Sequence, residues 1–159
     1  MKEKSVEFAE IQDPSIEEAL TTNGFIMSTI VGVSMLPTLR QNRDRVIIEV
    51  PKKQPGKYDI VLYKRWDGQY VLHRVLEVRE DYYVIRGDNT YVDEHIPFGD
   101  VKGVATHFVR GGKMVDVTDE RYQNYVKWLY RFYPLRKLIW RLHVFGSKVK
   151  RKIKGEFLQ

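Results

Sequence analysis

The chain has 159 residues, of which 43% are apolar and 13% aromatic, and it contains no cysteine. This length and apolar content predict one domain with a substantial core and, at most, a short appendage. The lack of cysteine excludes a disulfide framework, a thiolate metal site and a cysteine nucleophile. The four histidines show no ligand spacing with one another or with acids, so we expect no metal and no other cofactor.

The net charge of +6 comes entirely from the C-terminal part of the chain. Residues 121–159 hold 11 Lys and Arg and one acid, whereas residues 1–120 hold 16 basic and 20 acidic side chains. The tail, and not the body, is therefore the part that is predicted to meet a negatively charged partner.

No segment has the composition of a membrane span or a signal peptide. The longest uncharged run, 19–39, has 21 residues, but polar residues, two glycines and a proline interrupt it. The N-terminus stays acidic through Glu18, unlike a secretory leader. We therefore expect a cytoplasmic protein, and the basic tail adds the option of a peripheral position at the inner face of the membrane.

The body predicts one short helix followed by a series of short strands. Asp13-Pro14 and the acids after it are typical of a helix start, and Asn23-Gly24 is typical of its end. Runs rich in β-branched and aromatic residues, separated by Gly and Asp turns, then predict strands at 25–33, 45–50, 58–64, 70–78, 82–86 and 101–109. This order indicates a mainly β domain with an antiparallel sheet, either a barrel or an open coiled sheet.

From Thr118 the apolar residues recur at helical spacing as far as Pro134, which is expected to break or kink the helix. A narrow apolar stripe continues beyond it, with Lys and Arg on the polar side. The sequence therefore predicts a β domain at 1–118 and a basic amphipathic helical tail at 119–159.

Three interpretations of this tail stay open. The helix could pack on the body with its charges solvated. It could lie in a membrane interface, where the aromatic side chains sit at headgroup depth and the Lys and Arg of residues 121–154 face anionic lipid. It could also bind nucleic acid, because basic residues interleaved with aromatics suit phosphate and base stacking. Nucleic-acid binding is disfavoured, because the apolar stripe is too continuous for a helix that binds in a nucleic-acid groove.

Two positions in the body are candidates for nucleophilic chemistry. Ser34 follows a predicted strand and precedes Pro37, so its hydroxyl is placed to project from a sheet edge. Most serines in such loops are caps or turn residues. His73 interrupts the apolar alternation of a predicted strand. A lone strand histidine is more often structural, but a neutral imidazole can take a proton from a serine hydroxyl.

A third candidate region is the acidic stretch 87–94, which holds Asp88, Asp93 and Glu94. Its ordinary interpretation is a turn with side chain to backbone hydrogen bonds. Its functional interpretation is a source of the carboxylate that orients an imidazole, as in a catalytic triad.

Ser34, His73 and Asp88 each lie in one of five short motifs that follow one another along the chain. The motifs are Gly-Val-Ser-Met-Leu-Pro-Thr-Leu at 32–39, Asp-Arg-Val at 44–46, Tyr-Asp-Ile-Val-Leu-Tyr at 58–63, His-Arg-Val at 73–75 and Gly-Asp-Asn at 87–89. In combination they resemble the signal peptidase I / LexA-like serine peptidase superfamily over about residues 25–109. The segment 96–104 is similar to the closing strand of that family.

The resemblance implies a coiled antiparallel β fold in which Ser34 attacks a peptide carbonyl and its backbone N–H contributes to an oxyanion hole. At the base position, where bacterial signal peptidases and LexA-type repressors have lysine, this chain has His73. That is similar to the endoplasmic-reticulum and archaeal signal peptidases. The resemblance implies a catalytic carboxylate among Asp88, Asp93 and Glu94. We favour Asp93 as the partner of His73, with Glu94 as an open substitute, and Asp88 for structure or support.

Together these features predict a serine endopeptidase with a Ser-His(-Asp) site. Its expected substrate is a leader or signal-like peptide, or a small-residue site in a protein, cut in solution or at a membrane surface. Two alternatives remain open: a catalytically silent lipid- or protein-binding module, and a nucleic-acid-associated regulator. The segment before Ser34 contains no membrane span and no room for a DNA-binding domain, unlike the two branches of the family.

Overall fold

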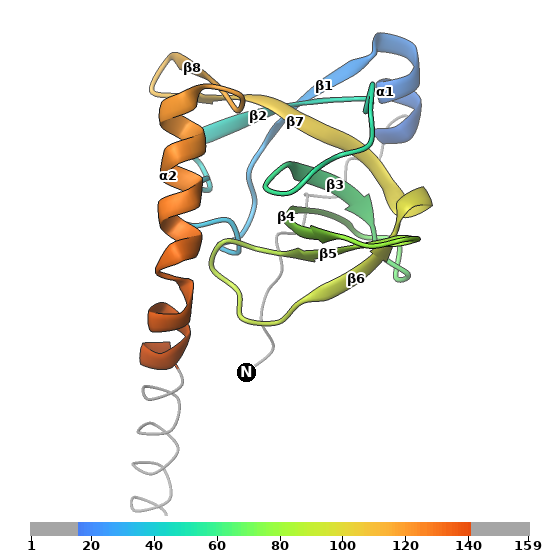
Figure 1. Cartoon of the computed structure of the whole chain (residues 1–159). Coiled ribbons are helices and arrows are strands. Elements are labelled where there is room, and N and C mark those ends of the chain that lie inside the picture. Colours follow the sequence, from blue (N-terminus) through green and yellow to red (C-terminus); the bar gives the residue numbers. More distant parts are fainter. Residues whose placement is uncertain (1–15, 141–159) are drawn as a thin grey trace, which may run out of the picture. The chain divides into compact units, whose positions relative to one another are not determined.

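The computed structural model describes residues 16–140, and over these residues the protein is mainly β, as predicted (Figure 1). Eight strands form one antiparallel sheet, accompanied by two α-helices and a short 3-10 helix. In chain order the elements are α1 (Ile16–Asn23), β1 (Phe25–Thr29), β2 (Asp44–Glu49), β3 (Ile60–Lys64), β4 (Tyr70–Val78), β5 (Tyr82–Arg86), β6 (Glu94–Pro97), η1 (Phe98–Asp100), β7 (Val101–Arg110), β8 (Lys113–Asp116) and α2 (Glu120–Arg131).

The strands follow the order β1-β2-β7-β3-β4-β5-β6, with β8 added to β7. Strand β7 is long enough to pair with β2 along one edge and with both β3 and β8 along the other (Figure 1). Within the described residues β1 and β6, at the two ends of this order, do not pair with each other. Of the two predicted architectures, the sheet is therefore the open one and not a closed barrel.

One face of β3, β4 and β5 carries a compact apolar cluster that surrounds the position of His73. Adjacent residues of a strand point to opposite faces, so His73 shares its face with Val71 and Val75, and with Val61, its cross-strand partner. The cluster consists of Val61, Tyr63, Val71, Val75, Tyr83, Ile85 and Ile96, with Phe98 and Val101 packed against it. The imidazole therefore lies beside this buried apolar cluster.

Several predicted strand boundaries agree with the structure, and the disagreements have local causes. Strands β4 and β5 have the predicted bounds. Strand β1 ends at Thr29, four residues before the predicted end, and the irregular chain that follows includes Gly32 at a φ of 86°. Strands β6 and β8 were not predicted: each has only four residues, and charges and turn formers surround both.

The chain divides into two compact units, Met1–Tyr122 and Gln123–Gln159, and the division falls inside α2. In the second unit, helical residues resume at 133–140 after a turn at position 132, so Pro134 stands in a first helical turn, where its missing N–H costs little. The predicted helix start at Asp13 and the end of the tail stripe, beyond 140, lie outside the described residues. In the part of the chain that the structure describes, no helix is both long enough and apolar enough to cross a membrane.

Candidate active site

Ser34 lies in the irregular loop between β1 and β2. Turn hydrogen bonds shape this loop, from the Leu36 N–H to the Val33 carbonyl (3.1 Å) and from the Leu39 N–H to the Met35 carbonyl (2.8 Å). Ser34 is only 2% exposed, and its Oγ lies 3.1 Å from Nε2 of His73. The loop thus carries a serine hydroxyl to hydrogen-bond distance of an imidazole that lies 39 residues further along the chain.

His73 is also 2% exposed, and its second ring nitrogen has two neighbours. Nδ1 lies 3.1 Å from Oε1 of Glu94 and 3.1 Å from the hydroxyl of Tyr63. A ring nitrogen carries either a proton or a lone pair, so Nδ1 can donate to the carboxylate or accept from the hydroxyl, but it cannot do both. Donation from Nδ1 to Glu94 therefore belongs to one tautomer of His73, and acceptance at Nδ1 from the Tyr63 hydroxyl belongs to the other.

Glu94, and not Asp93, contacts His73. Adjacent residues of an extended chain project to opposite sides, and Glu94 opens the edge strand β6 with its side chain toward the imidazole. Asp93 instead binds Arg86, with 2.9 Å between Oδ1 and Nη1. The structure therefore does not contain the favoured Asp93–His73 contact. Glu94, which the sequence analysis left open as a substitute, contacts His73 instead.

Arg65 holds the Glu94 carboxylate by two parallel hydrogen bonds, from Nε to Oε2 (2.9 Å) and from Nη2 to Oε1 (2.7 Å). Burial raises the pKa of Glu94, but hydrogen bonds from His73 and Arg65 outweigh burial and lower the pKa to about 2. Glu94 is therefore ionised at neutral pH, as an acceptor for an imidazole N–H must be.

Asp88 lies in a separate, fully buried network. Its carboxylate accepts from Nε and Nη2 of Arg74, at 2.8 and 2.7 Å, and from the hydroxyl of Thr38. Arg74 follows His73 in β4 and so points to the opposite face of the sheet. Asp88 therefore ties the Ser34 loop to β4.

The Gly-Asp-Asn segment also touches Ser34 through its backbone. The Asn89 N–H donates to the Ser34 carbonyl at 2.7 Å. A Cβ on Gly87 would lie 2.7 Å from that carbonyl oxygen and 3.0 Å from Nε2 of His73, closer than real Cβ contacts allow against backbone. Only glycine at position 87 therefore lets the segment approach the serine and the imidazole together.

No protein-family model and no curated protein matches this chain. The chemistry of the site is therefore argued from its own geometry.

Tyr63 and Arg65 were missed by the sequence analysis, although strand alternation contained a signal for them. Tyr63 lies two residues after Val61, the cross-strand partner of His73, so it shares the face of the imidazole, and Arg65 follows two residues later. Lys64 belongs to the other face, where it binds Glu17 at 3.2 Å. Nothing in the sequence pairs Arg65 with an acid 29 residues away.

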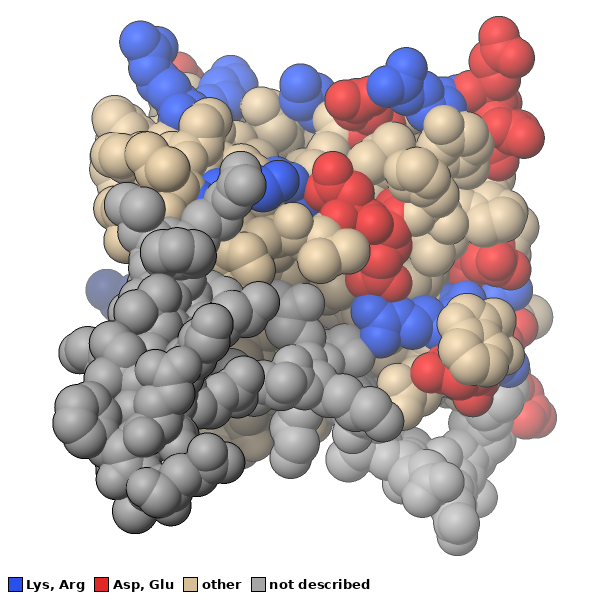
Figure 2. Space-filling model, turned by 90° about the horizontal axis from the view of Figure 1, so that it is seen from below, with Lys and Arg blue, Asp and Glu red and all other residues tan. Residues whose placement is uncertain are grey.

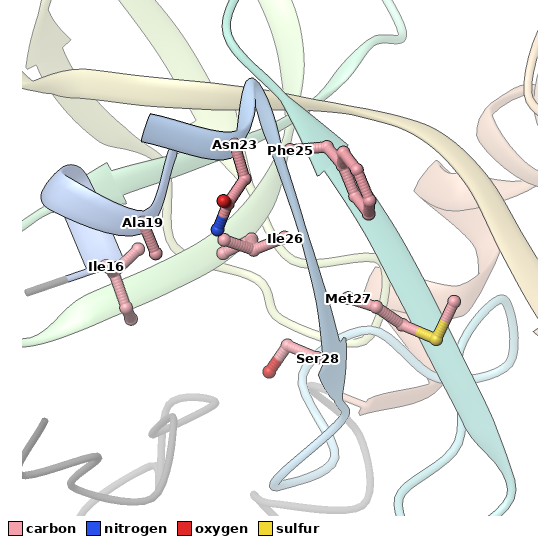
Figure 3. Close-up of a pocket in the computed structure, with 7 residues that line it drawn as sticks. All are labelled: Ile16, Ala19, Asn23, Phe25, Ile26, Met27 and Ser28. Carbon is pink, nitrogen blue, oxygen red and sulfur yellow. The ribbon is translucent and has the colours of Figure 1, made fainter. Parts of the chain in front are cut away.

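A surface pocket of about 520 Å³ lies between α1 and β1, apart from these side chains. Figure 3 shows Ile26 and Ser28 pointing from β1 toward Ile16 and Ala19, while Phe25 and Met27 project from the other side of the strand. Strand β1 ends the sheet and leads into the Ser34 loop.

Proposed function

We propose that the protein is a serine endopeptidase in which Ser34 is the nucleophile, His73 the general base and Glu94 the carboxylate that orients the base. One observation carries this proposal. A continuous chain of contacts runs from Ser34 through His73 to Glu94. The distance is 3.1 Å from Ser34 Oγ to His73 Nε2, and 3.1 Å from His73 Nδ1 to Glu94 Oε1. Serine, histidine and an ionised acid in this order are the arrangement that activates a hydroxyl for attack on a carbonyl.

The proposed reaction has two steps. As Ser34 Oγ attacks the peptide carbonyl, Nε2 of His73 takes the hydroxyl proton, and Glu94 stabilises the imidazolium through Nδ1–H. The imidazolium then gives the proton to the leaving amine, which frees the first product and leaves an acyl ester on Ser34. Water, deprotonated by the same imidazole, hydrolyses the ester. The Ser34 backbone N–H is the proposed donor to the developing oxyanion.

The resemblance to the signal peptidase I / LexA-like superfamily supports the same proposal. Two of its motifs are in direct contact in this chain, since the Asn89 N–H binds the Ser34 carbonyl and Asp88 binds Thr38. We therefore propose the histidine-type branch of that fold, with Glu94 in the place of the aspartate that the sequence analysis favoured.

For the substrate we propose an extended leader-like peptide with small side chains beside the scissile bond. Ser34 and His73 are almost fully buried, and the backbone of Gly87 approaches both, so there is little space next to the nucleophile. The outer edge of β1 is available within the described sheet for pairing with an extended chain.

Labelling with serine-reactive acylating probes tests the enzyme proposal. The wild type is expected to be labelled, and Ser34→Ala and His73→Ala are expected to abolish labelling, because one removes the nucleophile and the other its base. Thr118→Ala, which changes an exposed hydroxyl residue that follows β8, is the matched control and should keep the labelling.

Either of two results would contradict the enzyme proposal: labelling that survives in Ser34→Ala, or a folded wild type that several probe chemistries leave unlabelled. In the second case the silent binding module becomes the favoured function.

We also propose that the tail contacts an anionic membrane surface. Within the second unit, large apolar side chains are exposed along the helical residues, and Lys and Arg accompany them. The exposed set is Trp128, Phe132, Leu135, Leu138, Ile139 and Trp140. Apolar side chains at the acyl boundary with cations facing lipid phosphates are typical of an interfacial helix.

Where Figure 2 colours this face of the molecule, acidic and basic side chains lie among one another.

Glutamate substitutions in the tail test the membrane proposal. Leu138→Glu together with Ile139→Glu is expected to lower cosedimentation with anionic vesicles by about tenfold or more, since two apolar contacts are lost and two charges would enter the interface. The matched control is Met114→Glu, an exposed apolar residue of β8 outside the tail. Equal binding by the double variant, the control and the wild type would refute a lipid contact through the helix.

A further inference from the structure

The two neighbours of His73 Nδ1 have opposite consequences for the chemistry. If Nδ1–H donates to Glu94, Nε2 carries a lone pair and can take the proton of Ser34. If the Tyr63 hydroxyl donates to Nδ1, the ring proton sits on Nε2 and points at Ser34, which prevents proton transfer from the serine. Since both oxygens lie 3.1 Å from Nδ1, distance alone does not favour the productive tautomer.

Tyr63 is a competent proton donor in this position. Its side chain is fully buried, and burial together with the Glu94 carboxylate raises the pKa of the phenol, so the hydroxyl keeps its proton. A protonated phenol can donate its hydrogen to the lone pair of an imidazole nitrogen, so Tyr63 competes with Glu94 for Nδ1.

Glu94 can leave the imidazole unless something holds it. Glutamate has one more rotatable bond than aspartate, and Glu94 stands at the start of an edge strand, 24% exposed. With Arg65 it lines a surface pocket of about 390 Å³, into which a released carboxylate can turn. The two parallel bonds from Arg65, at 2.7 and 2.9 Å, oppose that movement.

We propose that Arg65 is a positioning residue that selects the productive tautomer of His73: it clamps Glu94 against Nδ1, so that Nδ1–H donates to the carboxylate and the Tyr63 hydroxyl does not donate to the imidazole. This inference rests on the proposed peptidase function. The titratable and charged side chains around the imidazole that enter it are Ser34, Tyr63 and Glu94, with Arg65 behind the last two.

The tautomer itself is measured by ¹⁵N NMR of histidine-labelled full-length protein at a pH where His73 is neutral, with His73→Gln to assign the signals. In the wild type we expect a protonated Nδ1 and an unprotonated Nε2. In Arg65→Gln we expect the opposite, because Glu94 is released and Tyr63 donates to Nδ1. The rate of acylation by the serine probe should fall with it by about 10- to 100-fold, as for other partners that orient a functional histidine.

A second substitution separates positioning from a general structural effect. Tyr63→Phe in the Arg65→Gln background removes the competing donor, so it should restore protonation at Nδ1 and recover much of the lost rate, whereas Tyr63→Phe alone should leave the tautomer unchanged. Arg65→Lys keeps the positive charge but not the two parallel hydrogen bonds to Glu94. It should give a population of the Nδ1-protonated tautomer between those of the wild type and Arg65→Gln. Lys64→Gln, which removes the neighbouring cation that binds Glu17, is the matched control and should behave as the wild type.

The inference is overturned if folded Arg65→Gln keeps its proton on Nδ1, or if Tyr63→Phe restores nothing in that background. If thermal melting shows that Arg65→Gln does not fold, an unchanged tautomer in Arg65→Lys overturns it equally. The NMR readout needs no activity. A wild type with the expected tautomer and no labelling would therefore refute the peptidase proposal and leave the role of Arg65 standing.

Discussion

Glu94→Gln is expected to lower kcat by roughly 10³- to 10⁴-fold with little change in KM, the size of effect seen when a triad acid becomes an amide. The amide of glutamine can donate to Nδ1, which would put the ring proton on Nε2, beside Ser34 Oγ at 3.1 Å. The imidazole would then lose its capacity to accept a proton, although the shape of the site would be preserved. Initial rates on a cleaved peptide, or rates of probe acylation, measure the effect.

Asp93→Asn is the matched control for that substitution. Asp93 is the neighbouring residue, is about half exposed, and binds Arg86 at 2.9 Å without touching His73. Since Asp93 lies outside the Ser34–His73–Glu94 chain, and asparagine keeps a side-chain oxygen that can accept from Arg86, we expect kcat to stay within about threefold of the wild type. If Asp93→Asn lowered kcat more than Glu94→Gln did, Asp93 would be the carboxylate that orients His73, and the proposed role of Glu94 would be wrong.

Arg74→Met is expected to lower the free energy of unfolding by about 3–5 kcal/mol, the cost of leaving a buried charge without its partner. The side chains of Arg74 and Asp88 are both fully buried, and methionine would remove the two guanidinium hydrogen bonds that the buried carboxylate accepts. Arg74 also donates to the Tyr58 carbonyl at 2.9 Å and to the Tyr122 hydroxyl at 3.2 Å. Urea unfolding followed by circular dichroism measures the change.

Two further variants decide whether the effect comes from the buried charge. Arg74→Met combined with Asp88→Leu removes both charges and should recover part of the loss, because no ion is then left in the core. The control is Arg79→Met, which breaks an exposed ion pair with Glu77 and should cost less than about 1 kcal/mol. An Arg74→Met protein as stable as this control would show that the pair does not anchor the Ser34 loop.

Periodicity in the sequence was enough to predict the antiparallel sheet and the strand that carries His73. Strands β4 and β5 have the predicted bounds because strong alternation and adjacent turns define them locally. His73 stood out for the same reason, as a polar residue on an apolar face, and Ser34 as the residue between a strand and a proline turn. Such features depend on neighbours in the chain, so a single sequence contains them.

The tertiary structure alone decided between Asp93 and Glu94 and brought Tyr63 and Arg65 to the imidazole. Strand β6 has four residues and no apolar alternation, so its register against β5 comes from pairing across the sheet, and a shift of one residue exchanges the two acids between faces. The clamp from Arg65 spans 29 residues of chain. Contacts of that kind depend on which strands become neighbours, and the packing of the whole sheet determines that.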